Sequence, residues 1–396
     1  MIQISPETQL FIREHSSDDV RALALQAKKY PDIDMPTAIT QIAGRQIAAE
    51  KIPSWREMEE IWYPKHLSLE QCSSEITARY KARLFQGDSL IDLTGGFGID
   101  CSFLATGFKT ATYVERQEEL CEIAAHNFPI LNLNHINVRN EDGVAYLQSM
   151  SPVDCIFLDP ARRNEHGGKT VAISDCEPNV AELEALLLSK ANRVMIKLSP
   201  MLDLSLALKE LKHTQEVHIL SVNNECKELL ILLGQTSPAE ITIHCVNLFT
   251  KGTQEEQHFV FTREQEQRSQ CTYTDSLGDY LYEPNASLLK AGAFRSIAAA
   301  YPVRKLHPNS HLYTSDSFIE NFPGRIFRIV NQCSFNKKEV KENLADLKKA
   351  NVTVRNFPAT VAELRKRIHL AEGGDTYLFA STLNNGQKVL IRCEKV

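Results

Sequence analysis

Ser89–Gly98 reads S-L-I-D-L-T-G-G-F-G, an apolar strand-like run that leads straight into three glycines. Glycine accepts backbone conformations with positive φ and lets the main chain approach a ligand closely. The residues after Gly98 are predicted to begin a helix, whose first N–H groups have no partner inside the helix and suit a polar or anionic ligand. The stretch therefore predicts a buried strand, a loop that binds a nucleotide-containing cofactor, and a helix; the alternative is a tight turn without a ligand.

The residues that follow repeat the pattern of a short apolar run and an amphipathic stretch. Alternation of this kind predicts parallel strands joined by helical crossovers. The last two runs are separated by too few residues for a crossover, so we expect them to pair antiparallel. The predicted strands are 89–93, 110–115, 136–140, 155–160, 193–199, 216–222 and 228–234, and the helical stretches are 118–125, 180–189 and 204–211.

Changes in the pattern of predicted helices and strands divide the chain into four expected domains. Residues 1–85 have a helical pattern punctuated by prolines, and residues 86–236 hold the α/β alternation. Residues 237–320 mix strand-like segments with polar loops, which predicts a small α+β domain. Residues 321–396 alternate strand and helix and end in two strands linked through Asn384, Asn385 and Gly386, a hairpin signal.

Composition excludes several classes of protein. Hydrophobic residues make up 43% of the 396 and charged residues 24%, which is ordinary for a folded chain. No apolar run approaches the about 18 residues that would cross a bilayer, so we expect a cytoplasmic protein without a membrane partner. The ten cysteines form no CxxC pair and no Cys/His spacing of the zinc type, so we expect reduced thiols and no metal.

The charge of the chain is unevenly distributed. The net charge of −6 argues against a general nucleic-acid coat, yet residues 321–371 hold 11 Lys and Arg against 4 Asp and Glu. We expect this end to contact phosphate, with a solvated charged face as the alternative. The candidate phosphate contacts on its second predicted helix are Arg365, Lys366 and Arg367.

Glu115 stands at the tip of the second predicted strand, where a carboxylate can accept both ribose hydroxyls of an adenosine. Dinucleotide dehydrogenases share this feature, but three observations argue against NAD. Cys101 stands where G-x-G-x-x-G needs its third glycine, Asp92 begins the pattern D-x-x-G-G-x-G, and the sheet ends in a hairpin.

The glycine loop resembles the first motif of the class I S-adenosylmethionine-dependent methyltransferases, [D/E]-x-G-x-G-x-G, with Thr94 in place of the first glycine. The resemblance implies S-adenosylmethionine as the cofactor. Asp92 would orient the loop or receive the methionine amine, unless it is a buried structural residue. Asp142 would contact the adenine amine, cap the following helix, or do both. The candidate cofactor residues are Asp92, Thr94, Gly95, Gly96, Gly98, Glu115 and Asp142.

Residues 155–163 read C-I-F-L-D-P-A-R-R, which puts Asp159 at the carboxyl end of the fourth strand, where open α/β sheets bind their ligands. Enzymes that methylate exocyclic amines usually have an aromatic residue where Arg162 stands, and this weakens the amine assignment; we count Arg162 as a candidate RNA contact. D-P-A-R also resembles the D-P-P-R of RNA uracil carbon-5 methyltransferases. Leu198 replaces the cysteine nucleophile of those enzymes, so we do not expect carbon-5 chemistry.

Asp159, Lys197 and Glu228 lie at predicted strand tips and resemble part of the K-D-K-E set of RNA ribose 2′-O-methyltransferases. Lys81 is the candidate for the remaining lysine. A lysine beside two carboxylates can lower the pKa of a hydroxyl group and take its proton. We therefore take Asp159, Lys197 and Glu228 as candidate catalytic residues, with a salt-bridge set as the alternative, and ribose and amine targets both stay open.

From end to end the sequence resembles a family of bacterial methyltransferases with a helical N-terminal region, a class I catalytic domain, a ferredoxin-like domain and a C-terminal THUMP-like domain. The resemblance implies an α/β fold with a Rossmann-like seven-stranded sheet, and a methyltransferase acting on RNA, with tRNA favoured. The alternatives are a methyltransferase for a protein or small molecule, and a non-catalytic RNA-binding protein on a methyltransferase scaffold. The motifs that carry the resemblance are 69–82, 92–98, 158–163, 225–230, 280–292 and 355–367.

Overall fold

The computed structural model describes residues 4–162 and 172–396. The chain divides into two compact units, one of Met1–Gln215 with Leu230–Pro238 and the other of Glu216–Leu229 with Ala239–Val396.

The N-terminal part of the first unit is helical, as predicted. Three of its helices begin at side-chain caps, because Ser5, Asp19 and Asp34 accept hydrogen bonds from backbone N–H groups of the first turn. Pro6 and Pro53 occupy first positions of helices, where a missing N–H costs nothing. The helices are α1 (Pro6–Glu14), α2 (Val20–Leu25), η1 (Ala27–Lys29), α3 (Met35–Lys51), α4 (Pro53–Arg56), α5 (His66–Gln71) and α6 (Glu75–Leu84).

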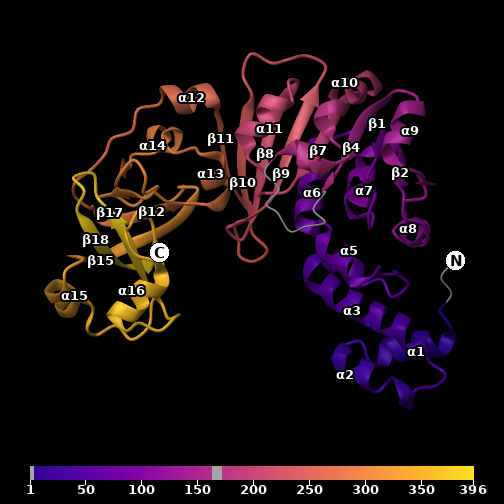
Figure 1. The fold of residues 1–396 in the computed structure, drawn as a ribbon, viewed down its shortest axis with the longest axis horizontal. Helices are drawn as coiled ribbons and strands as arrows, with labels where there is room; N and C mark the ends of the chain where they lie inside the picture. The colour runs from indigo at the N-terminus through magenta and orange to yellow at the C-terminus, as the bar shows by residue number, and fades with distance from the viewer. Residues whose placement is uncertain (1–3, 163–171) are drawn as a thin grey trace. The chain divides into compact units, whose positions relative to one another are not determined.

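An α/β alternation follows in the first unit (Figure 1). Strands β7, β4, β1, β2 and β3 lie side by side in that order, and all four pairs are parallel. Helices α7 and α8 pack on β2 through a buried cluster that includes Cys101, Tyr113 and Phe128. The elements are β1 (Gly87–Asp92), α7 (Ile99–Leu104), η2 (Ala105–Gly107), β2 (Phe108–Glu115), α8 (Glu118–Ile130), β3 (Ile136–Asn140), α9 (Gly143–Ser149), β4 (Val153–Leu158), β5 (Ala161–Arg162), η3 (Ile173–Asp175), β6 (Cys176–Glu177), α10 (Val180–Lys190), β7 (Ala191–Leu198) and α11 (Leu204–Glu210).

The next two strands, β8 (Thr214–Val222) and β9 (Glu225–Gly234), are neighbours in the sheet and are joined through Asn223 and Asn224. Both asparagines have positive φ, 49° and 68°, as the tight turns of antiparallel hairpins require. The whole sheet follows the order β11-β10-β8-β9-β7-β4-β1-β2-β3. The expected α/β fold class is confirmed.

The sheet has nine strands, two more than the seven expected. Strand β10 (Thr242–Leu248) pairs parallel to β8, and β11 (Glu256–Thr262) pairs antiparallel to β10. The burial of β8 explains why β10 pairs with it. A strand at the edge of a sheet leaves backbone N–H and C=O groups unpaired, and in a buried strand these groups need another strand as a partner. From the sequence, both strands were expected in a separate domain.

A seven-stranded sheet in the order β13-β14-β12-β15-β18-β17-β16 forms the rest of the second unit. Its β17–β18 hairpin is antiparallel, as predicted from the turn that contains Gly386. Helices α15 and α16 contribute Leu344 and Leu364 to a buried cluster with β17 and β18. The elements are α12 (Arg263–Arg268), β12 (Tyr280–Pro284), α13 (Ala286–Ala291), α14 (Ser296–Ala300), β13 (Arg304–Lys305), β14 (Tyr313–Ser315), β15 (Gly324–Ser334), α15 (Lys337–Leu344), β16 (Asn351–Val354), α16 (Val361–Ile368), β17 (Thr376–Thr382) and β18 (Lys388–Lys395).

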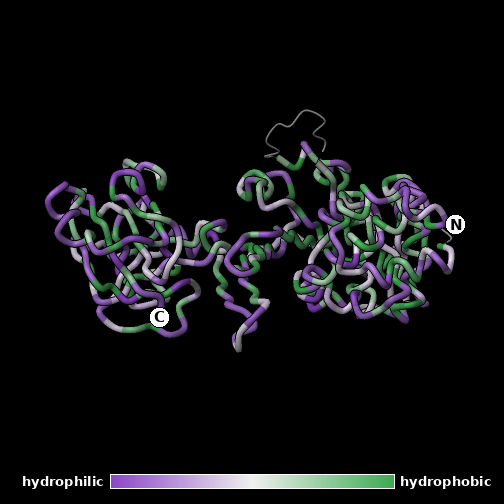
Figure 2. The backbone as a smooth tube through the Cα atoms, turned by 90° about the horizontal axis from the view of Figure 1, so that it is seen from below, coloured by the Kyte–Doolittle hydropathy of each residue, from purple (hydrophilic) through white to green (hydrophobic). Residues whose placement is uncertain are grey.

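Among the described residues, no helix is both long and apolar enough to cross a membrane. Figure 2 shows hydrophobic and hydrophilic residues interleaved along the tube. All ten cysteines are free, in agreement with the expected reduced thiols.

Candidate active site

The glycine loop between β1 and α7 needs its glycines for two different reasons. A Cβ atom on Gly95 would lie 2.2 Å from the ring of Tyr113, so a side chain has no room there. Gly96 and Gly98 have positive φ, 54° and 85°. Within the described part of the chain, a Cβ on Gly96 would meet nothing closer than 3.8 Å, which leaves that side of the loop open for a ligand.

Glu115, at the end of β2, lies against this loop. Its Oε2 accepts a hydrogen bond from the Gly96 N–H at 2.9 Å, and its Oε1 accepts one from the Gln117 N–H at 2.8 Å. The residue is 9% exposed. Each carboxylate oxygen can accept a second hydrogen bond, so the carboxylate remains able to accept ribose hydroxyls.

Asp92 and Thr94 connect the loop with the tip of β4. The Thr94 N–H donates to Asp92 Oδ1 at 3.0 Å, and the Asp159 N–H donates to Thr94 Oγ1 at 2.6 Å. Burial raises the pKa of Asp92 well above its usual value, and the nearby carboxylates add to the effect. These contacts favour the loop-orienting role for Asp92, and they explain why a hydroxyl stands where the motif has a glycine.

Asp142 caps α9, because its Oδ1 accepts hydrogen bonds from the N–H groups of Val144 and Ala145, each at 3.0 Å. A Cβ on Gly143 would lie 2.2 Å from the carbonyl oxygen of Leu93, so the start of α9 approaches the end of β1 closely. The cap is one of the two roles expected for Asp142, and the adenine contact stays a prediction.

A chain of charged side chains leads away from Asp159. The Nζ of Lys197 lies 2.6 Å from Asp159 Oδ2 and 3.3 Å from Asp100 Oδ2. The Nζ of Lys81 lies 2.9 Å from Asp100 Oδ1. Ser73 joins the group, since its Oγ donates to Asp100 Oδ2 at 2.7 Å and accepts from Lys81 and Lys197 at 2.8 and 3.1 Å. We call Ser73, Lys81, Asp100, Asp159 and Lys197 the lysine–carboxylate chain.

Burial differs along the lysine–carboxylate chain. Lys81 is completely buried and Lys197 is 8% exposed, whereas the Asp159 side chain keeps 36% of its surface open. Asp159 is therefore the member that a substrate can reach. The three N–H groups of the Lys197 ammonium have acceptors in Ser73, Asp100 and Asp159.

The two carboxyl groups of the lysine–carboxylate chain, those of Asp100 and Asp159, have opposite pKa shifts. Burial raises the pKa of Asp100, but Lys81 and Lys197 outweigh it and lower the pKa to about 2. Burial raises the pKa of Asp159 above its usual value, with Lys197 acting in the opposite direction. Asp100 is therefore a fixed anion between two lysines, while Asp159 takes a proton more readily.

The structure joins Asp159, Lys197 and Lys81, as the sequence analysis anticipated for the two lysines and the aspartate. Glu228 is buried on β9 in the second unit, and its catalytic role stays a prediction. The sequence analysis missed Ser73 and Asp100. A signal for both exists, since Ser73 lies within the motif 69–82 and Asp100 follows the glycine loop by two residues.

The predicted RNA contacts differ in accessibility. Arg162 belongs to β5, but its side chain lies outside the described residues, as does Arg163 of the same motif. Arg365 is partly buried and donates to the carbonyl oxygen of Ala350 at 3.1 Å. Lys366 and Arg367 are exposed, and the Arg367 guanidinium lies 3.9 Å from the centre of the Phe335 ring.

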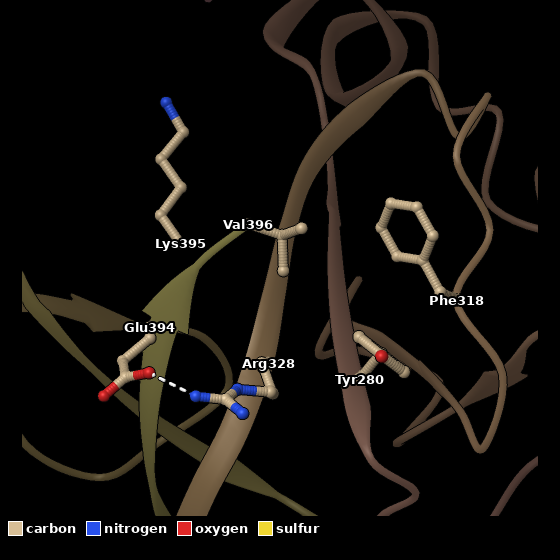
Figure 3. A pocket seen from close by; sticks show the side chains of 6 residues that line it. All are labelled: Tyr280, Phe318, Arg328, Glu394, Lys395 and Val396. Carbon is tan, nitrogen blue, oxygen red and sulfur yellow. Dashed lines mark hydrogen bonds and ion pairs between the residues drawn. The ribbon is translucent and has the colours of Figure 1, made fainter.

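A pocket of about 380 Å³ lies in the second unit (Figure 3). The rings of Tyr280 and Phe318 are tilted by 52° to each other with centroids 5.6 Å apart, and Phe318 is 46% exposed. Arg328 and Glu394 form an ion pair of 2.8 Å in the pocket wall. Its lining residues are Tyr280, Phe318, Arg328, Glu394, Lys395 and Val396.

Comparisons with known proteins agree with this architecture. Residues 280–323 match the model of a ferredoxin-like domain, and residues 324–395 match that of a THUMP domain-like family. A crystal structure of a candidate methyltransferase from Porphyromonas gingivalis W83 is 34% identical, with a TM-score of 0.87 and coverage of 100% of both chains. No curated protein matches the sequence.

Two further solved structures match a smaller part of the chain. An rRNA methylase from Streptococcus thermophilus is 14% identical over 40% of this chain and 93% of its own, with a TM-score of 0.30. A candidate methyltransferase from Streptococcus mutans in complex with SAH is 12% identical over 40% of this chain and 96% of its own, also with a TM-score of 0.30. Both likenesses are too weak to inform on the activity of this chain.

Proposed function

The chain belongs to the same family as the candidate methyltransferase of Porphyromonas gingivalis, and from this membership we propose that it is an S-adenosylmethionine-dependent methyltransferase that acts on RNA, with tRNA as the favoured substrate. The observation that carries the proposal is the position of Asp159. Its backbone N–H is bound to Thr94 of the glycine loop and its carboxylate to Lys197. A reactive carboxylate is thereby held beside a cofactor loop.

The glycine loop fits the proposed cofactor. The open side of Gly96 accommodates a ligand close to the main chain, and Glu115 offers acceptors for two ribose hydroxyls. Asp92 supports the loop because its carboxylate accepts a hydrogen bond from the Thr94 N–H. S-adenosylmethionine would supply a methyl group bonded to a positively charged sulfur. A nucleophile can attack this methyl group, and the sulfur then leaves as a neutral thioether.

Asp159 would accept a hydrogen bond from the nucleophile and so orient its lone pair toward the methyl group. Lys197 fixes the carboxylate through Oδ2. Because each N–H group of Lys197 already has an acceptor, we assign Lys197 a positioning role, not that of a base. This assignment favours an amine nucleophile over a ribose hydroxyl, which would need a base beside it.

The C-terminal domain supports an RNA substrate through its exposed cations. Arg325 and Arg355 both pair with Glu283 and are not available to phosphate. Seven cations on or beside helices α15 and α16 are exposed, and their charge suits the nucleic-acid backbone. The exposed Phe318 ring is of the kind on which a base stacks. The exposed cations of the two helices and their flanks are Lys337, Lys338, Lys341, Lys348, Lys349, Lys366 and Arg367.

Mass spectrometry of nucleosides tests the proposal. RNA is isolated from cells with and without the protein, and RNA from the deficient cells is then treated with the purified chain and S-adenosylmethionine. We expect one methylated nucleoside to be absent from the deficient cells and restored by the treatment. A methyl group on a base amine supports the role given to Asp159, whereas a ribose-methylated product contradicts it. Identical nucleosides in both cell types, with no transfer in vitro, would refute the proposed function.

A further inference from the structure

Four side chains from three neighbouring strands meet on one face of the sheet in the second unit. Glu216 and His218 are two residues apart on β8, so they point to the same side. The parallel pairing of β10 with β8 puts His244 directly beside His218. On β11, His258 pairs with Val246, two residues from His244, and reaches the same face.

The distances within this group suit a single metal ion. His218 Nε2 lies 3.1 Å from Glu216 Oε2, and His244 Nε2 lies 3.6 Å from the same oxygen. One ligand atom from each of the three residues lies within 4.8 Å of the other two. Ligand atoms about 2.0–2.2 Å from a tetrahedral ion are about 3.3–3.6 Å apart, which is close to the two distances to the Glu216 oxygen.

One of the two imidazole rings would have to turn for both to bind the same ion, since each nitrogen lone pair lies in the plane of its own ring. The His218 and His244 rings are stacked, with centroids 4.3 Å apart and an interplanar angle of 5°. His244 Nε2 is buried and has no hydrogen-bond partner among the residues that the structure describes. The other ring nitrogen, Nδ1, lies 3.2 Å from His258 Nε2. If Nδ1 carries the hydrogen and donates it to His258, the lone pair of Nε2 points into the cluster, as in metal-ligating histidines whose second nitrogen is hydrogen-bonded.

We propose that Glu216, His218 and His244 bind one divalent transition-metal ion, with Zn²⁺ as the ion that this set of nitrogen and oxygen ligands suits, and that His258 orients His244. Three protein ligands leave one tetrahedral position open to water or a small ligand. Glu216 is the accessible ligand, since its side chain is 45% exposed while that of His218 is 3% exposed. The ion would join β8 to β10. This site departs from the sequence-based expectation that the chain binds no metal, and it does not depend on the proposed methyltransferase function.

The site could not be predicted from the sequence, for a physical reason. Glu216 and His218 lie 26 positions or more before His244, and the three residues do not form a local Cys/His spacing of the kind typical of zinc sites. Only the pairing of β10 with β8 brings them together.

Zn²⁺ titration of the full-length chain, freed of metal by chelation, tests the site. Competition with a chromophoric chelator gives the number of ions bound and their affinity. We expect one Zn²⁺ per chain, a loss of affinity of about 100-fold or more in His244→Gln, and a smaller loss of about 10-fold to 100-fold in His258→Gln. The matched control is His213→Gln, which removes a His–Glu pair of 3.3 Å outside the cluster and should bind like the wild type.

Two further measurements exclude binding by cysteines and loss of folding as explanations of the result. The ten cysteines can also bind Zn²⁺, so Co²⁺ is substituted, and its absorption spectrum should lack the near-ultraviolet charge-transfer band of thiolate ligands. Circular dichroism checks that each variant is folded, and Glu216→Gln, at a half-exposed position, repeats the test if His244→Gln is not folded. The absence of Zn²⁺ binding in the wild type, or equal affinity in the wild type and the folded variants, would overturn the proposal.

Discussion

At the glycine loop, two backbone N–H groups bind one carboxylate, whereas at the tip of β4 five side chains bind one another. Gly96 and Gln117 each donate a backbone N–H to Glu115. The lysine–carboxylate chain instead connects Ser73 and Lys81 of the N-terminal helical region with Asp100, Asp159 and Lys197. The loop contact therefore depends on backbone conformation, and the lysine–carboxylate chain depends on the packing of side chains in the first unit. Substitutions at the two places should have different consequences.

Asp100→Asn should give the largest effect, a loss of about 3–5 kcal/mol in the free energy of unfolding, because it leaves two buried lysines without their shared carboxylate. Urea unfolding of the full chain measures it. Asp142→Asn is the control, since asparagine also caps helices and should change stability little. Equal stability of wild type and Asp100→Asn would mean that packing of the N-terminal helices does not depend on the lysine–carboxylate chain.

Glu115→Ala should weaken S-adenosylmethionine binding by about 1.5–3 kcal/mol, because the variant lacks the charged carboxylate that would accept hydrogen bonds from the ribose hydroxyls. Calorimetry on the purified chain measures the affinity. NAD should show no binding to either protein, and the exposed Glu118→Ala should bind the cofactor like the wild type. Unchanged affinity in Glu115→Ala would remove Glu115 from the cofactor site.

Acid should weaken the lysine–carboxylate chain, and with it the fold, through Asp100. Its pKa of about 2 in the folded chain lies below its ordinary value of 3.8, so the ionised form stabilises the fold. This stabilisation, about 2 kcal/mol, is present above pH 4 and is lost as the pH falls toward 2. The stability difference between wild type and Asp100→Asn should therefore shrink between pH 6 and pH 3 in urea unfolding. A difference that grows on acidification would contradict the ion pairing.

RNA binding should show the smallest effects. Replacing Lys366 and Arg367 by Gln should flatten the dependence of log affinity on log salt by about 0.7–0.9 for each phosphate that the helix no longer binds. Arg365→Gln should change the slope less, because its guanidinium is bound to Ala350. Filter binding of tRNA over a series of salt concentrations gives the slopes. An equal slope in the wild type and the Lys366/Arg367 double variant would exclude this helix from the RNA interface.

The same contrast explains which features could be predicted from the sequence. The strands, the glycine loop and Glu115 were recognisable because periodicity and turn residues are local properties. The part played by Ser73 and Asp100 was missed, because it depends on Lys197 of β7, which lies 124 and 97 residues away from them in the sequence. Strands β10 and β11 were recognised as strands, but the pairing of β10 with β8 was not predicted, since sequence periodicity does not reveal which strand pairs with which.

Methyl transfer by Asp159→Asn at saturating S-adenosylmethionine is the sharpest test of the proposed mechanism. The experiment follows labelled methyl groups into RNA from cells that lack the protein, and Asp154→Asn, at the other end of β4, is the control. We expect Asp159→Asn to bind the cofactor and RNA like the wild type but to transfer methyl groups at least about 100-fold more slowly, within the range for removal of a positioned catalytic group. Wild-type transfer by Asp159→Asn would contradict the mechanism.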